Sequence, residues 1–190
     1  MRKLGISIIV SLVLLSVYSF TTNRENSYVN KVNWMTWEQA VEMSKIEKRK
    51  IVVAVYTDWC GWCKKMDKTT YNNAYLASYI NDNFYAVHFD AEQKEPIEFQ
   101  GKVYKYVNPA NGKRGYHEFA SAMTMGRMSY PSTIFFDENL GLIQPIPGYQ
   151  DTQTFEMILT YFGDDFYKKV PWDQYEKTYV PMNKPQFISD

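Results

Sequence analysis

The strongest constraint on the fold is an apolar run followed almost at once by two cysteines. Residues 51–56, IVVAVY, are apolar and rich in β-branched side chains, which is typical of a strand covered on both faces. Residues 57–67, TDWCGWCKKMD, contain no proline and have good helix formers from Lys64 onward. The CGWC segment is therefore expected where a central strand turns into a helix.

The remaining patterns alternate between helices and strands. Thr36 can cap a helix of about ten residues, and residues 84–90, FYAVHFD, form a second strand. Because a helix joins it to the first strand, the two should be parallel. Residues 132–137 and 142–146 fit a hairpin, and Asp151 can cap a final amphipathic helix. The sequence predicts an α/β fold with a mixed central sheet flanked by helices.

The 190 residues are enough for one domain of ordinary size. Residues 1–22 have a cationic start and a long uncharged, mostly apolar run, which indicates a secretory signal peptide or, if it is not cleaved, an N-terminal membrane anchor. We expect residues 23–33 to be a linker, 34–170 the domain and 171–190 a C-terminal extension. Export predicts a periplasmic or secreted protein, in which a close cysteine pair forms a disulfide.

The charge balance argues against polyanionic partners. Lys and Arg together number 21, and Asp and Glu together number 21, so no long-range field would gather nucleic acid or an anionic membrane surface. We therefore expect no nucleic-acid partner.

The position of the cysteines favours redox chemistry. A thiolate is the species that attacks a disulfide, and the free N–H groups at a helix N-terminus stabilise its charge. We expect Cys60 to be the nucleophile. Cys63, deeper in the first turn, can then attack the mixed disulfide on Cys60 and release the reduced substrate.

Other interpretations of the pair stay open. A closed zinc site needs four ligands, and the chain adds only His88 and His117 as imidazoles. A purely structural disulfide would close a very short loop and would stabilise the fold little. Met123, Met125 and Met128 with the two sulfurs would suit a Cu(I) delivery protein. A peptide-binding module with an idle disulfide is a further alternative.

Two segments carry a resemblance to a known family. VVAVYTDWCGWCKKMD resembles the active-site strand and helix of the thioredoxin family, and SYPSTIFFDENLGLIQPIPGY resembles its proline turn and following hairpin. The resemblance covers roughly residues 34–165 and is greatest to secreted thioredoxin-like proteins and the C-terminal domain of the periplasmic reductant transporter DsbD. It implies a thioredoxin fold.

The resemblance also implies roles for residues near the cysteines. Pro131 matches the family's cis-proline, which lies beside the cysteine pair and leaves the backbone of Tyr130 free to pair with a substrate peptide. Trp59 matches the tryptophan before the first cysteine. With Gly61 and Trp62 these residues are the expected substrate contacts.

Several positions depart from thioredoxin itself. Trp62 replaces the proline between the cysteines, which implies a different redox potential. Ala54, six residues before Cys60, replaces a buried aspartate, and Ala86, four before Asp90, replaces the lysine paired with it. The second cysteine must then lose its proton to water or to another group.

An insertion of about residues 91–127 precedes the proline turn. Residues 96–108 fit a hairpin that turns at Gln100–Gly101, and residues 116–125 fit a helix after a loop. Because the insertion leads directly into Tyr130, we expect it to border the redox site and to select partners, or else to cover a sheet edge.

These observations predict an exported thiol-disulfide oxidoreductase that works without a cofactor or a metal. Its partners would be protein thiols and disulfides, together with a membrane or periplasmic redox partner.

Overall fold

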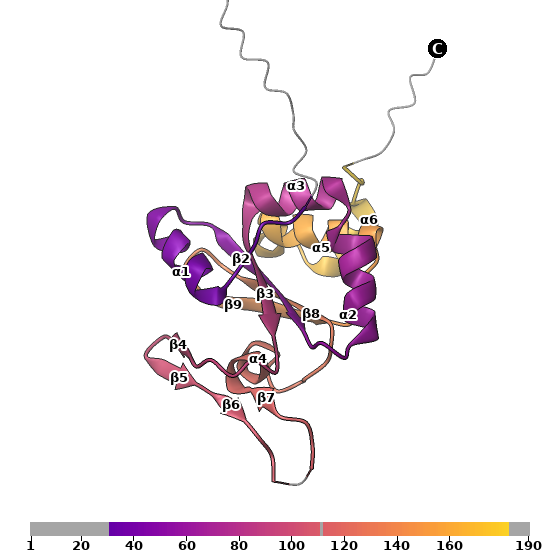
Figure 1. Cartoon of the computed structure of the whole chain (residues 1–190). Helices are drawn as coiled ribbons and strands as arrows, with labels where there is room; N and C mark the ends of the chain where they lie inside the picture. The colour runs from indigo at the N-terminus through magenta and orange to yellow at the C-terminus, as the bar shows by residue number, and fades with distance from the viewer. Residues whose placement is uncertain (1–30, 111, 183–190) are drawn as a thin grey trace, which may run out of the picture.

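The computed structural model describes residues 31–110 and 112–182 of the chain. Its centre is a five-stranded sheet with the order β1-β3-β2-β8-β9 and helices on both faces (Figure 1). β1, β3 and β2 run parallel, whereas β8 is antiparallel to β2 and to β9. The strands are β1 (Trp34–Met35), β2 (Lys50–Tyr56), β3 (Phe84–Asp90), β8 (Ser132–Phe136) and β9 (Leu142–Pro147). The predicted mixed α/β sheet is confirmed.

The helices divide the core into two halves. One face of the sheet packs against α2, α3, α5 and α6, and the other against α1 and α4. The helical segments are α1 (Trp37–Ile46), α2 (Gly61–Met66), the π-helix η1 (Asp67–Tyr71), α3 (Ala74–Asn83), α4 (Glu118–Met123), α5 (Thr152–Gly163), the 3₁₀-helix η2 (Phe166–Lys168) and α6 (Trp172–Thr178). No helix in the described ranges is long and apolar enough to cross a membrane.

β2 is enclosed on both sides, as its continuous apolar sequence predicts. Val52 and Ala54 face the α3 and α5 side, and Ile51, Val53 and Val55 face the α1 side. Enclosing one large aliphatic side chain contributes roughly 1.5–3 kcal/mol, so β2 anchors both halves of the core.

The start of α1 follows the predicted capping box. Thr36 Oγ1 accepts the Gln39 N–H at 3.3 Å, and Gln39 Oε1 accepts the Thr36 N–H at 2.9 Å. Asp151 caps α5 in the predicted way, since its carboxylate accepts the Thr154 N–H at 2.8 Å. β1 has only two residues, too few to leave a pattern in the sequence.

The insertion forms two small hairpins gathered around α4 below the sheet (Figure 1). β4 (Ile97–Phe99) pairs with β5 (Lys102–Tyr104), and β6 (Tyr106–Val107) pairs with β7 (Tyr116–His117). Gln100 and Gly101, at the predicted turn, both have positive φ, 51° and 74°.

The helix predicted from Tyr116 to about Met125 is present, but it is shorter at both ends. Tyr116 and His117 belong to β7, and α4 begins at Glu118 because the His117 ring nitrogen accepts the Phe119 N–H. It ends at Met123, two residues before Met125 takes a positive φ of 52°.

The chain ends that the structure describes pack onto the domain. Val32, in the predicted linker, is buried in the core, and so is Tyr175 of α6, in the predicted extension. Tyr175 also hydrogen-bonds Thr160 of α5 at 2.7 Å. The predicted signal peptide or anchor, residues 1–22, lies outside the described residues.

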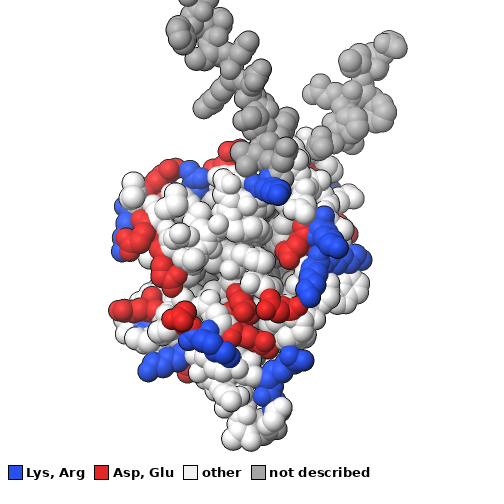
Figure 2. Space-filling model, in the orientation of Figure 1, with Lys and Arg blue, Asp and Glu red and all other residues white. Residues whose placement is uncertain are grey.

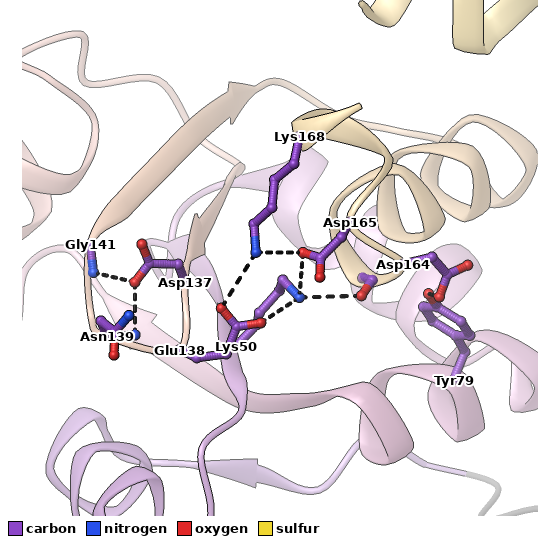
Figure 3. Close-up of polar contacts among 10 residues, drawn as sticks. Lys50, Tyr79, Asp137, Glu138, Asn139, Gly141, Asp164, Asp165 and Lys168 are labelled. Atoms are coloured by element: carbon purple, nitrogen blue, oxygen red, sulfur yellow. Dashed lines mark hydrogen bonds and ion pairs between the residues drawn. The ribbon is translucent and has the colours of Figure 1, made fainter. Parts of the chain in front are cut away.

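A buried lysine joins three segments at the start of β2 (Figure 3). Lys50, only 6% exposed, places its Nζ 2.7 Å from Glu138 in the β8–β9 turn and 2.9 Å from Asp165 after α5. It also donates to the Gly163 carbonyl at 3.3 Å. We call the four residues Lys50, Glu138, Gly163 and Asp165 the Lys50 clip. The clip lies at the opposite end of β2 from the cysteine pair.

Candidate active site

Cys60 and Cys63 form a disulfide at the start of α2. Cys60 is the N-cap residue, and its Sγ accepts the Cys63 N–H at 3.1 Å. Cys60 is 6% exposed and Cys63 is 3% exposed, so Cys60 is the slightly more accessible of the two. Gly61 between them is exposed, and a Cβ built there would meet nothing within 4 Å. The surface at Gly61, between two nearly buried cysteines, is therefore open to solvent.

The helix that follows supplies polar and cationic surroundings. α2 and η1 form one helical segment of residues 61–71, whose N-terminal N–H groups face the cysteine end. Lys65 Nζ lies 4.6 Å from the ring centre of Trp62 and 4.8 Å from that of Tyr149. Trp62 is 57% exposed, so the contacts hold an exposed indole beside the disulfide.

The proline turn meets the cysteine turn at the same end of the sheet. The Tyr130–Pro131 peptide bond is cis, and the next residue, Ser132, pairs with Val55 near the end of β2. The rings of Trp59 and Tyr130 pack edge to face with centroids 5.9 Å apart. The structure thus brings together two segments that are some seventy residues apart in the chain, as the family resemblance implies.

Burial, followed by the charges of Glu92 and Asp90, raises the pKa of the Tyr130 phenol to about 12. The hydroxyl therefore remains protonated at neutral pH. It donates to Met128 Sδ at 3.9 Å.

Trp59 is held by residues that the sequence did not single out. Its indole N–H donates to Glu92 Oε1 at 2.9 Å, and the Arg114 guanidinium lies 4.7 Å from the ring centre. Trp59 is still 49% exposed. Since Glu92 and Arg114 both belong to the insertion, that segment borders the candidate site.

The place of the absent charged pair is taken by neutral groups. Ala54 pairs with Thr133 of β8, and the Thr133 hydroxyl lies 3.1 Å from the Tyr71 hydroxyl. Burial raises the pKa of Tyr71 well above its ordinary range. A neutral hydroxyl pair therefore occupies the interior beside Ala54.

A histidine lies on the same face of the sheet. His88, paired with Ala54 across β2 and β3, stacks on Tyr56 with ring centroids 4.0 Å apart. Its Nε2 is 3.6 Å from Asp67 Oδ1, and Asp67 lies one helical turn after Cys63. His88 and Asp67 are thus polar neighbours of the second cysteine's helix.

The three methionines of the copper hypothesis have different surroundings. Met123 is buried in the core on the α1 and α4 side of the sheet, whereas Cys63 belongs to α2 on the other side. Met125 is exposed, and Met128 Sδ accepts a hydrogen bond from Thr124 at 3.5 Å. The arrangement does not favour a shared Cu(I) site.

Acidic and basic side chains are interspersed over the molecular face in Figure 2. This agrees with the equal numbers of the two kinds in the sequence.

Comparison with known proteins identifies one domain type. The model of a thioredoxin-like domain family matches residues 37–163. The solved structure of a thioredoxin-fold protein from Helicobacter pylori superposes with a TM-score of 0.52 at 21% identity, covering 68% of this chain and 79% of that chain.

Two curated proteins are similar over a shorter range. Spermatogenesis-associated protein 20 of Mus musculus is 26% identical over 114 residues, which is 60% of this chain and 14% of that protein. An uncharacterized protein of Caenorhabditis elegans is 29% identical over 89 residues, 46% of this chain and 12% of that protein. The chain thus matches only a small part of the length of each.

Proposed function

The chain belongs to the thioredoxin-like domain family, and on this premise we propose that it is an exported thiol-disulfide oxidoreductase. It exchanges disulfides with protein substrates through Cys60 and Cys63. The observation that carries the proposal is the Cys60–Cys63 disulfide at the N-cap of α2, with the exposed residues Trp59, Gly61 and Trp62 around it. Export is supported by the apolar leader in residues 1–22.

The exchange begins with the reduced pair. The Cys60 thiolate attacks one sulfur of a substrate disulfide, a new S–S bond forms, and the other substrate sulfur leaves as a thiolate that takes up a proton. Cys63 then loses its proton and attacks Cys60 Sγ. The intramolecular disulfide forms as the mixed disulfide breaks, so two electrons pass to the substrate.

The reverse sequence oxidises a substrate dithiol. Which direction prevails is set by the potential of the pair relative to that of its partner. Trp62 between the two sulfurs is one residue through which this potential can differ from that of thioredoxin.

The substrate contacts surround the disulfide. Trp59 and Trp62 present flat apolar surfaces of the kind that suit a peptide chain. The Tyr130 ring packs against Trp59, and the backbone of Tyr130 is the segment with which we expect an extended substrate peptide to pair.

The proposal is tested by reduction of insulin with purified protein and dithiothreitol. Cys60→Ser should abolish the activity because no nucleophile remains. Cys63→Ser is the matched variant, since it keeps the nucleophile and should accumulate mixed disulfides on Cys60. Full activity of Cys60→Ser, or no trapped partners with Cys63→Ser, would contradict the assigned roles.

The exposed indoles also fit a second candidate, a peptide-binding module with an idle disulfide. In that case the protein with both cysteines replaced by serine would keep its affinity for extended peptides, and the wild type would reduce no insulin.

A further inference from the structure

Thr57, the residue that follows β2, has a buried hydroxyl without a partner. The residue is 1% exposed, and its Oγ1 has no hydrogen-bond partner within the described part of the chain. A buried hydroxyl without a partner is less favourable than a paired one. The Thr57 hydroxyl is therefore a donor that an acceptor formed beside it would engage.

The other buried hydroxyls of serine and threonine show that this is unusual for the molecule. Each of them has a partner within 3.1 Å, among the described residues: Ser44, Thr70, Thr124, Ser132, Thr133 and Thr160. Thr57 is the exception, and it lies three residues before the first cysteine.

The backbone ties Thr57 to that cysteine. The Cys60 N–H donates to the Thr57 carbonyl at 3.1 Å, so residues 57–60 form one tight turn. Within this turn the Cys60 sulfur is the group whose hydrogen-bonding capacity changes with redox state. In the disulfide it is a weak acceptor, whereas as a thiolate it carries a full negative charge and accepts strongly.

We propose that the Thr57 hydroxyl donates a hydrogen bond to the Cys60 thiolate when the pair is reduced. Thr57 thereby acts as a residue that sets the acidity of the nucleophile and the redox equilibrium of the pair. A role for this hydrogen bond in disulfide exchange rests on the proposed oxidoreductase function. The hydrogen bond itself requires only that the disulfide can be reduced.

The hydrogen bond changes the Cys60 pKa and the redox equilibrium of the pair, each in a defined direction. It lowers the pKa of Cys60, because it stabilises the charged form. It also stabilises the reduced protein relative to the disulfide form, which makes the pair more oxidising. The charged groups around the site are the same in every Thr57 variant, so their effects on the Cys60 pKa and on the redox equilibrium cancel when variants are compared. These groups are Asp58, Lys64, Lys65, Asp90, Glu92 and Arg114.

The test compares Thr57→Val with Thr57→Ser. Valine has the shape of threonine without the hydroxyl, and serine restores the donor. The equilibrium of Cys60 and Cys63 with glutathione should shift about ten-fold toward the disulfide in Thr57→Val, which corresponds to roughly 30 mV. In a Cys63→Ser background, Thr57→Val should raise the Cys60 pKa by about one unit, as followed by thiolate absorbance. Thr57→Ser should stay close to the wild type in both measurements.

Urea unfolding of both redox forms separates this role from a structural one. Thr57→Val should leave the disulfide form as stable as the wild type or more so, because it removes an unpaired buried hydroxyl, and should destabilise the reduced form. Equal effects on the two forms, or a Cys60 pKa and a glutathione equilibrium unchanged in Thr57→Val, would overturn the proposal. If the valine variant does not fold, Thr57→Ala permits the same comparison.

These measurements use no protein substrate. A wild type that fails to reduce insulin would refute the proposed function and leave the Thr57 result standing.

Discussion

Replacing Lys50 by methionine tests whether the Lys50 clip stabilises the fold. The Lys50 amine is almost completely buried and contacts two carboxylates and a carbonyl. Its most distant partner in the sequence is Asp165, 115 positions away. Methionine keeps most of the apolar stem in place while it removes the charge. The change therefore isolates the polar contacts from the packing.

The expected loss follows from the exposure of the partners. Glu138 and Asp165 are 31% and 36% exposed, so they regain water in the variant and each ion pair is worth about 0.5–1 kcal/mol. The charged hydrogen bond to Gly163 is long at 3.3 Å and adds about 1 kcal/mol. Lys50→Met should lower the free energy of unfolding by about 2–3 kcal/mol.

Urea unfolding of the disulfide form at neutral pH measures this loss. With a slope near 2 kcal/mol per molar urea, the midpoint should fall by about 1–1.5 M. Lys168→Met is the matched control, because Lys168 pairs with the same two carboxylates at 3.9 and 2.9 Å but has a half-exposed side chain. Its loss should be no more than about 0.5 kcal/mol.

The difference between wild type and Lys50→Met should also depend on pH. Burial alone would raise the pKa of Glu138, but the hydrogen bond and charge of Lys50 outweigh it, so the pKa lies below its ordinary value of 4.5. In Asp165, burial is likewise outweighed by Lys168 and Lys50, and the pKa lies below 3.8. Because both are lowered by folding, their contribution is complete above these ordinary values and is lost as the pH falls through the folded-state values.

The pKa of Lys50 shifts in the opposite direction on folding. Burial would lower its pKa, but the two carboxylates raise it above 10.5, so its contribution is complete below that pH and declines above it. A variant as stable as the wild type at neutral pH, or more stable, would refute the reasoning. It would show that the cost of removing the amine from water exceeds the gain from its partners.

Two further predictions concern the site. Tyr71→Phe should lower the free energy of unfolding by about 1–2 kcal/mol, because it leaves the buried Thr133 hydroxyl without its partner. Urea unfolding should show that adding Thr133→Val restores part of this loss. No recovery would count against a direct hydrogen bond between the two hydroxyls. Arg114→Ala should raise the KM for a peptide disulfide about two- to five-fold with little change in kcat, since a cation–π contact of about 0.5–1 kcal/mol no longer steadies Trp59. An unchanged KM would mean that the insertion borders the site without serving it.

Much of the domain could be predicted because its signals are local. The β-branched run of β2, the capping box at Thr36 and the turn at Gln100–Gly101 each depend on neighbours within a few residues, and all three are found in the structure. The helix after Asp151 follows from its cap and its apolar period in the same way.

The errors occurred where a distant partner overrides local preference. Tyr116 and His117 suit a helix, but they pair with β6 and His117 becomes the cap of α4. The burial of the Lys50 amine also left no signal in the sequence, because Glu138 and Asp165 reach it from elsewhere in the fold.

The sequence by itself determined the order of strand, cysteine pair and helix, since each depends on residue types at short spacing. Only the tertiary structure decided what surrounds the cysteines: Arg114 and Glu92 against Trp59, the hydroxyls beside Ala54, and the unpaired hydroxyl of Thr57. The physical reason is that hydrogen bonds, ring contacts and burial depend on which distant segments pack together, and no short spacing encodes that packing.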